Sequence, residues 1–253
     1  MIVTSVDEAQ SELARLFNRA RRVTGFTGAG VSTECGIPDF RSPGSPWLRN
    51  RPIDFDLFLS DPLMREEAWR RKFAMDDIYA GAGPGRGHRA FAQLIAEGKM
   101  GAVITQNIDG LHQAAGAPAH KVIELHGNGT YAKCLRCGRR YELADVRREF
   151  ERTGAAPDCV CGGAIKSATI SFGQAMPENE VRRAHDETDS CDLFLAVGSS
   201  LVVYPAAGFP ALAKRRGATL AIINREETPL DDMADFVLRG DIGTILEPFV
   251  PSA

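Results

Sequence analysis

The chain has 253 residues, of which 44% are hydrophobic and 25% are charged, and its formal net charge is −3. A chain of this length can bury one large core beside a small insertion, and its nearly balanced charge gives no reason to expect a nucleic-acid partner. No apolar run approaches the roughly 20 residues that span a bilayer, so we expect no membrane association. The first residues lack a secretion signal and four of the cysteines form close pairs, which predicts a reducing, cytoplasmic location.

The first half of the chain predicts two helices, a strand and a proline-rich excursion. Ser5 and Glu8 have the spacing of a capping box, so we expect a helix there, followed by a buried strand at residues 22–26. Residues 42–86 are rich in proline and predict a flexible loop and a small helical module. A further helix is predicted at residues 88–97.

Continuous apolar runs predict further strands at residues 102–105, 122–125, 193–197, 220–223 and 236–238, with a last helix from Asp241 to Phe249. Such runs indicate strands that are covered on both faces. The predicted fold class is therefore α/β, a Rossmann-like parallel sheet with helices on both faces, at residues 1–45, 87–130 and 168–253. A small domain combines residues 46–86, the cofactor loop and helical module, with residues 131–167, a zinc-ribbon insert.

Polar residues and glycines follow several of these strands closely, namely Gly28, Gln106, His126, Gly198 and Asn224. In open α/β sheets, ligands bind beyond the carboxyl ends of the strands. We therefore expect these segments to meet at one edge of the sheet and to form a ligand site.

Four cysteines lie in two close pairs, Cys134-x-x-Cys137 and Cys159-x-Cys161. Each pair can supply two thiolates to a tetrahedral Zn²⁺. A redox Cys-x-x-Cys is the alternative, but it does not require the second pair. We therefore predict one structural zinc ion with no chemical role.

The stretch from Thr27 to Arg41 combines a candidate phosphate-binding turn with three side chains that can contact a ligand. Gly28-Ala29-Gly30 follows the first strand, as in a phosphate cradle, but Thr33 stands where the full dinucleotide fingerprint has its third glycine. Gly-x-Gly alone is weak evidence, because most matches are ordinary turns. Asp39-Phe40-Arg41 adds a carboxylate, an aromatic face and a cation to the same loop.

Six further features accompany this loop, namely Thr105–His112, Glu124–Gly127, the cysteine pairs, Ile170–Gly173, Gly198–Ser200 and Asn224. Together, the loop and these features resemble the sirtuins, which are NAD-dependent protein lysine deacylases. The resemblance covers residues 22–245. It implies that His126 is the catalytic base on a ribose hydroxyl, with Asn107 and Asp109 at the nicotinamide and ribose end. It also implies an NAD site at Gly28, Ala29, Gly30, Thr33, Asp39, Phe40, Arg41, Gln106, Asn107, Ile108, Asp109, Gly198, Ser199, Ser200, Asn224, Arg225 and Ile242.

The same resemblance implies acyl-lysine proteins or peptides as partners. Two segments resemble the strands that hold a substrate peptide, namely Ile170, Ser171, Phe172 and Gly173, and Val202, Val203 and Tyr204. The acidic residue common after Phe-Gly is replaced by Gln174. Trp69 and Lys72 take the positions of a tyrosine and an arginine that select acidic acyl groups, so we expect a preference for neutral acyl groups.

Two other functions use the same residues. An ADP-ribosyltransferase or NAD hydrolase would share His126 and the cofactor loops, and only its products would differ. A non-catalytic module that binds NAD or peptides would not need His126, Asn107 and Asp109 together.

Overall fold

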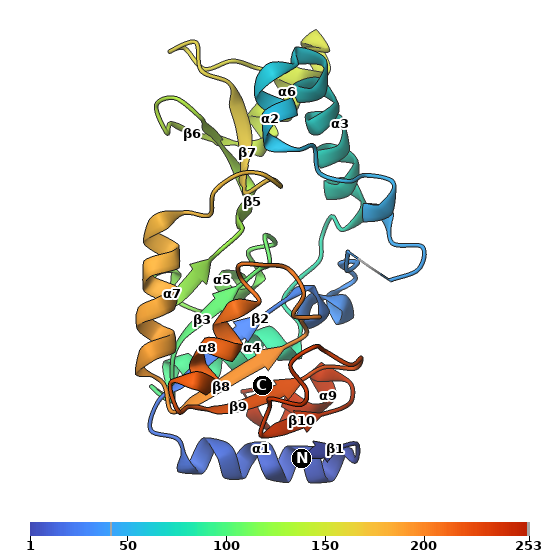
Figure 1. The fold of residues 1–253 in the computed structure, drawn as a ribbon. Coiled ribbons are helices and arrows are strands. Elements are labelled where there is room, and N and C mark those ends of the chain that lie inside the picture. The colour runs from blue at the N-terminus through green and yellow to red at the C-terminus, as the bar shows by residue number, and fades with distance from the viewer. Residues whose placement is uncertain (41, 252–253) are drawn as a thin grey trace.

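The protein is described by a computed structural model that covers residues 1–40 and 42–251. Its larger part is built on a seven-stranded sheet with the order β1-β10-β9-β8-β2-β3-β4, in which every pair is parallel (Figure 1). The strands are β1 (Ile2–Val3), β2 (Val23–Thr27), β3 (Met100–Thr105), β4 (Val122–Glu124), β8 (Leu193–Val197), β9 (Thr219–Ile223) and β10 (Phe236–Leu238).

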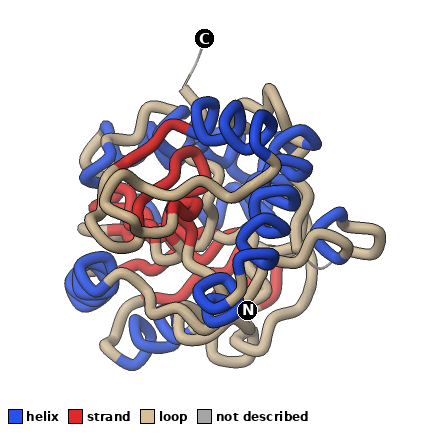
Figure 2. The backbone as a smooth tube through the Cα atoms, turned by 90° about the horizontal axis from the view of Figure 1, so that it is seen from above, coloured by secondary structure: helices blue, strands red, loops and turns tan. Residues whose placement is uncertain are grey.

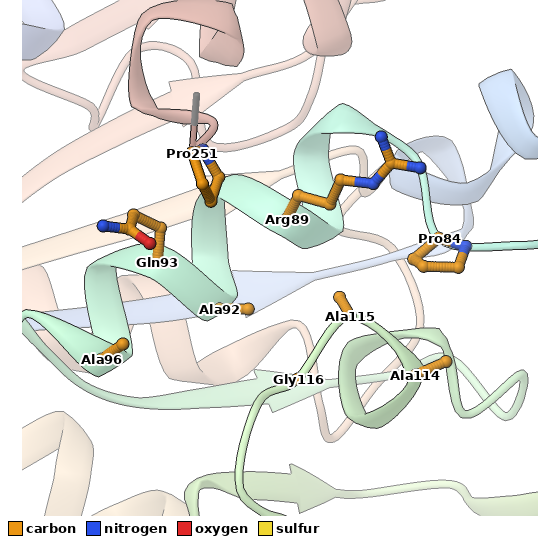
Figure 3. Close-up of a pocket in the computed structure, with 9 residues that line it drawn as sticks. All are labelled: Pro84, Arg89, Ala92, Gln93, Ala96, Ala114, Ala115, Gly116 and Pro251. Carbon is orange, nitrogen blue, oxygen red and sulfur yellow. The ribbon is translucent and has the colours of Figure 1, made fainter. Parts of the chain in front are cut away.

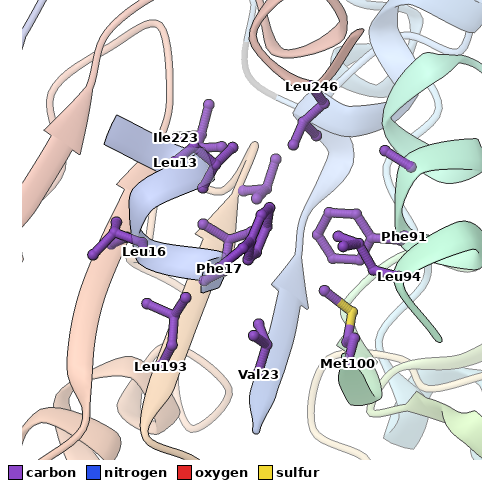
Figure 4. Close-up of a cluster of buried hydrophobic side chains, with 14 of the residues drawn as sticks. Leu13, Leu16, Phe17, Val23, Phe91, Leu94, Met100, Leu193, Ile223 and Leu246 are labelled. Atoms are coloured by element: carbon purple, nitrogen blue, oxygen red, sulfur yellow. The ribbon is translucent and has the colours of Figure 1, made fainter. Parts of the chain in front are cut away.

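Helices cover both faces of this sheet (Figure 2). One face packs against α1 (Val6–Arg19), α4 (Arg86–Ala96) and α9 (Ile242–Leu246), and the other against α7 (Glu178–Ser190) and α8 (Gly208–Arg215). The packing of β8 explains why hydrophobic and polar residues do not alternate in its sequence. Leu193 and Leu195 enter the first core, which Figure 4 shows with Phe17 and Phe91, whereas Phe194 enters the second. Both faces of the strand are thus apolar.

The smaller part is an antiparallel three-stranded sheet with the order β6-β5-β7, formed by β5 (Gly127–Cys134), β6 (Arg140–Glu142) and β7 (Ile165–Thr169). It packs with α2 (Phe55–Ser60), α3 (Pro62–Ile78) and α6 (Leu143–Thr153), at the top of Figure 1. Trp69 and Phe73 of α3 share a core with Val146 and Ile165, so the helical module and the cysteine segment form one packed unit.

The predicted strands of the large sheet and its last helix are confirmed, and α9 continues into a 3₁₀ helix at Glu247–Phe249. The capping box is wrong: Ser5 precedes α1, but its side chain makes no cap hydrogen bond, and its carbonyl accepts from the Ala9 amide instead. The small sheet reaches Gly127 and Thr169, beyond residues 131–167, and the division into domains stays a prediction. Within residues 1–40 and 42–251, no helix is long and apolar enough to cross a membrane.

Candidate active site and zinc site

The three central strands end side by side, and this places their loops together. Thr27 is in register with both Thr105 and Val197. Beyond these residues, the Gly28 amide donates to the Val197 carbonyl at 3.1 Å and the Gln106 amide donates to the Thr27 carbonyl at 3.0 Å. The segments that begin at Gly28, Gln106 and Gly198 therefore start from one edge of the sheet.

Glycine is required where two of these loops touch. Gly198 has φ +63°, and a Cβ on it would lie 2.5 Å from the Val31 amide nitrogen. A Cβ on Gly28 or Gly30 would lie 2.7 Å from backbone atoms of Gly198. These glycines thus let the loop after β2 pack on the loop after β8, and the phosphate contact that the sequence predicted for them stays a prediction.

A small pocket lies between the loop after β2 and the loop after β3. It is lined by Ala29, Ser32, Ile37, Pro38, Phe40, Trp47, Tyr79, Asn107, Ile108 and Asp109. The side-chain amide nitrogen of Asn107 donates to the Gly28 carbonyl and to Ser32 Oγ, both at 3.1 Å. Asp109 accepts from Ser32 Oγ at 2.7 Å and from the Leu111 amide at 2.9 Å. Asn107 and Asp109 are therefore held rigidly in the pocket wall, and the structure brings them together with Ala29 and Ile108.

His126 follows β4 at the same edge of the sheet. Its Nδ1 lies 3.1 Å from the carbonyl oxygen of Gln106, and because a carbonyl only accepts, Nδ1 must carry the proton. Nε2 is then left as the basic nitrogen, and none of the described residues hydrogen-bonds it. Burial lowers the pKa of His126, and the bond to Gln106 opposes this shift only in part. A neutral imidazole with a free Nε2 can accept a proton at neutral pH.

The predicted cofactor loop folds over the pocket. Phe40 is 44% exposed and stacks on Trp47 with ring centroids 4.4 Å apart. The Asp39 carboxylate accepts from the amide and hydroxyl of Ser42. Thr33 donates its hydroxyl to the Gly30 carbonyl within the 3₁₀ helix Ala29–Cys35, and Arg41 lies outside the described residues.

The remaining predicted NAD contacts lie at two further strand ends. Ser199 accepts from the Gln106 side chain at 2.8 Å, which ties the loops after β3 and β8 together, and Ser200 follows it. Asn224 comes directly after β9 and donates to the Glu226 carbonyl. Arg225 is exposed, and its guanidinium lies 3.5 Å from the carboxylate of Asp241, the residue that precedes Ile242.

The two predicted peptide-binding segments are not in strands. The Ile170 amide donates to the His126 carbonyl at 2.8 Å, so the segment of Ile170, Ser171, Phe172 and Gly173 begins beside His126. In the first segment, Phe172 is 61% exposed. In the second segment, Val202 is 40% exposed and Tyr204 is 70% exposed, and Val203 lies between them in the sequence. Part of this backbone is already hydrogen-bonded, since the Phe172 carbonyl accepts from the Phe55 amide and the Val203 carbonyl accepts from the Ala207 amide. The exposed apolar side chains of both segments can still flank an added strand.

The structure buries Trp69 in the small domain and pairs Lys72 with Asp76. Trp69 is 2% exposed and donates its indole N–H to the Ile165 carbonyl at 3.3 Å inside the small domain. This arrangement gives its side chain no access to a substrate. Lys72 is largely buried and forms an ion pair with Asp76, which also accepts from the Tyr79 hydroxyl at 3.0 Å. Only Tyr79 of this group lines the pocket.

The zinc prediction has a clear geometric counterpart. The sulfurs of Cys134, Cys137, Cys159 and Cys161 all lie within 4.8 Å of one another. Zn–S bonds of about 2.3 Å in a tetrahedron place sulfurs about 3.8 Å apart. The observed pairs Cys134–Cys161 at 3.5 Å and Cys137–Cys159 at 3.7 Å are close to this value. Four sulfur donors leave no open position, so the site fits one structural Zn²⁺.

Neighbouring groups also suit thiolates. The Tyr141 hydroxyl donates to Cys159 at 2.9 Å, and the Arg136 amide donates to Cys134 at 3.4 Å. Gly163 leaves room for the cluster, since a Cβ there would lie 2.7 Å from the Cys134 sulfur. Such contacts orient the ligands of a metal.

A separate surface hollow lies between α4 and α5 (Leu111–Ala114), beside Pro251 (Figure 3). It is lined by alanines, Pro84, Gln93, Gly116 and the exposed Arg89, and it contains none of the predicted site residues. The site residues that the sequence did not single out are Ser32, Trp47 and Tyr79, which line the small pocket. Ser32 lies just after Gly28-Ala29-Gly30, so this motif could have identified it as a site residue.

Comparison with known proteins agrees with this arrangement. The sequence model of the Sir2 family matches residues 28–205. NAD-dependent protein deacetylase 1 of Bradyrhizobium diazoefficiens is 57% identical over 251 residues, which cover 99% of this chain and 98% of that protein. An NAD-dependent protein deacetylase of Rhodopseudomonas palustris is 56% identical over 251 residues, with 99% of each chain covered.

Solved structures show the same likeness. A Sir2 structure with a p53 peptide and NAD⁺ has a TM-score of 0.83 and 40% identity, and covers 94% of this chain and 96% of that one. A structure of Sir2 bound to acetylated peptide has a TM-score of 0.82 and 38% identity, and the match covers 94% of this chain and 96% of that one. The sequence match and the shared fold together show that this chain belongs to the Sir2 family.

Proposed function

We propose that this chain is an NAD-dependent protein lysine deacylase, which converts NAD, an acyl-lysine and water to nicotinamide, lysine and O-acyl-ADP-ribose. The observation that carries the proposal is the position of His126, whose basic Nε2 is left free at the strand edge where the loops after β2, β3 and β8 meet. Membership of the Sir2 family supports the same activity.

NAD, when bound, supplies the bond between ribose and nicotinamide that is broken. We assign its nicotinamide end to the pocket walled by Asn107, Ile108 and Asp109, and its phosphates to the loop Gly28–Gly30 with Ser199 and Ser200. The bond from Gln106 to Ser199 fixes the spacing between these two groups. Phe40, backed by Trp47, can exclude water from the ribose. Asn224, Arg225 and Ile242 are assigned to the adenosine end.

His126 acts as the general base on a ribose hydroxyl in this proposal. The Gln106 carbonyl holds the proton on Nδ1, so Nε2 keeps its lone pair, and burial keeps the ring neutral at neutral pH. His126 also accepts the Ile170 amide on its backbone carbonyl, which links the base to the proposed peptide segment. The proposed base and the proposed peptide segment would then be held together by this backbone hydrogen bond.

Protein substrates would bind as an added strand between Ile170–Gly173 and Val202–Tyr204. Backbone hydrogen bonds to an added strand give affinity without a strict sequence requirement. We expect neutral acyl groups to be preferred, because the ammonium of Lys72 is already neutralised by Asp76. The four thiolate ligands imply reduced cysteines, which supports a cytoplasmic location.

The decisive experiment incubates the purified protein with NAD and an acetyl-lysine peptide and identifies the products by mass spectrometry. We expect O-acetyl-ADP-ribose in equal amount to deacetylated peptide, and loss of both with His126→Ala. His120→Ala, which removes an exposed histidine, is the matched control and should keep full activity. Free or protein-linked ADP-ribose without deacetylation would replace this function with NAD hydrolysis or ADP-ribosyl transfer.

A further inference from the structure

A buried histidine outside the proposed catalytic set contacts the pocket wall from behind. His88 lies in the first turns of α4 and is 0% exposed. Its Nε2 lies 3.3 Å from Ser32 Oγ, and its Nδ1 accepts a hydrogen bond from the Gly85 amide at 3.3 Å. Nothing in the proposed reaction uses this imidazole directly.

The direction of each hydrogen bond can be assigned. Since the Gly85 amide donates to Nδ1, the neutral ring carries its proton on Nε2. Ser32 has a single hydroxyl proton, which it donates to the Asp109 carboxylate at 2.7 Å, so Ser32 must accept from His88. Ser32 Oγ also accepts from the side-chain amide of Asn107. The bonds therefore run in one direction, from Gly85 through His88 and Ser32 to Asp109.

We infer that His88 is a positioning residue for the nicotinamide pocket, which holds the Ser32 hydroxyl in the one orientation that fixes Asp109 and Asn107. This inference rests on the proposed function, because it assumes that those two side chains meet the nicotinamide end of NAD. We call the three side chains His88, Ser32 and Asp109 the relay.

Burial makes the orientation matter. A hydroxyl that loses an acceptor or donor inside a protein leaves a polar group unsatisfied, and this costs more than the bond itself contributes. Burial also lowers the pKa of His88, opposed by the charges of Asp109 and Glu34, so the neutral form with one fixed tautomer is favoured. The His112 ring, 5.0 Å away, and the Cys35 sulfur, 3.8 Å from Nδ1, complete its surroundings.

The test compares three substitutions that separate the two ring nitrogens. His88→Gln keeps an N–H near the position of Nε2 and can still donate to Ser32. His88→Asn keeps polar atoms near Nδ1 only, and His88→Leu keeps neither. Phe91→Leu is the control, because it removes packing from the same helix without touching the relay.

Dissociation constants for NAD and ADP-ribose are measured by calorimetry, and KM and kcat by release of nicotinamide. We expect His88→Leu and His88→Asn to weaken NAD about tenfold in Kd and KM, roughly what one hydrogen bond to a charged network contributes. Affinity for ADP-ribose, which lacks nicotinamide, should stay unchanged, and His88→Gln should restore most of the NAD affinity.

Equal losses for NAD and ADP-ribose, equal effects of the glutamine and leucine variants, or the same selective loss in Phe91→Leu would each overturn the inference. If the unsubstituted protein deacetylates no peptide, the proposed function fails instead. The comparison of NAD with ADP-ribose still tests His88 in that case, since it needs binding alone.

Discussion

Gly198→Ala offers a direct test of the idea that two loops must touch to form the cofactor site. Gly198 has φ +63°, a conformation that costs a residue with a Cβ about 1–2 kcal/mol. The new methyl group would also lie 2.5 Å from the Val31 amide nitrogen and 2.8 Å from the Gly30 carbonyl carbon, both backbone atoms that cannot rotate away. Such overpacking costs about 1–3 kcal/mol.

Together these effects predict a loss of about 2–5 kcal/mol in the free energy of unfolding, and a Tm about 4–20 °C lower for a chain of this size. The loops must also separate, so the KM for NAD should rise. Gly208→Ala is the matched control, because no atom lies within 4 Å of its added Cβ, and it should leave both values unchanged. Calorimetry and steady-state kinetics measure them. A Gly198→Ala protein with the Tm and KM of the control would refute the claim that these loops need the glycine.

Three further predictions concern the acyl group, the base and the zinc site. Asp76→Asn removes the ion-pair partner of Lys72, so turnover of a succinylated peptide should rise relative to turnover of the same peptide in acetylated form. An unchanged ratio of the two turnover rates would show that Lys72 does not face the acyl group. Because His126 must be unprotonated to act and its pKa is lowered, kcat/KM should fall to half its maximum at a pH below about 6.5; a midpoint above pH 6.5 on the acid side would contradict this. Removal of zinc should open the core around Trp69 and shift its fluorescence to the red in a Trp47→Phe background; unchanged emission after chelation would count against a structural metal.

The sequence alone determined the elements whose signal is local. Continuous apolar runs identified β8 and β9, because a strand buried on both faces needs apolar residues at every position. The spacing of the cysteines identified the metal cluster for a similar reason, since two close pairs can each reach one ion. Helix α7 was missed: its residues are mostly charged, and only Ala184 and Thr188 are buried.

Motif order predicted residues from segments that the structure brings to one edge of the sheet, but not what each side chain contacts there. Gly28 was predicted to contact a phosphate, and the structure adds a second reason for glycine, since a Cβ on Gly28 would lie 2.7 Å from the Gly198 carbonyl oxygen. Trp69 was matched by its distance from a proline, yet its ring is buried against Ile165. A linear spacing along a helix does not reveal which face the packing selects.

Only the tertiary structure showed how the site is supported. The tautomer of His126 depends on the Gln106 carbonyl, which is 20 residues away in the chain. The orientation of Asp109 depends on Ser32, whose hydroxyl contacts His88 across 56 residues. Hydrogen bonds of this kind are set by distances of a few tenths of an ångström between distant segments, and no local pattern of residues encodes them. The sequence thus determined which chemical groups are present, and the packing of the strand ends decided which way their protons and lone pairs point.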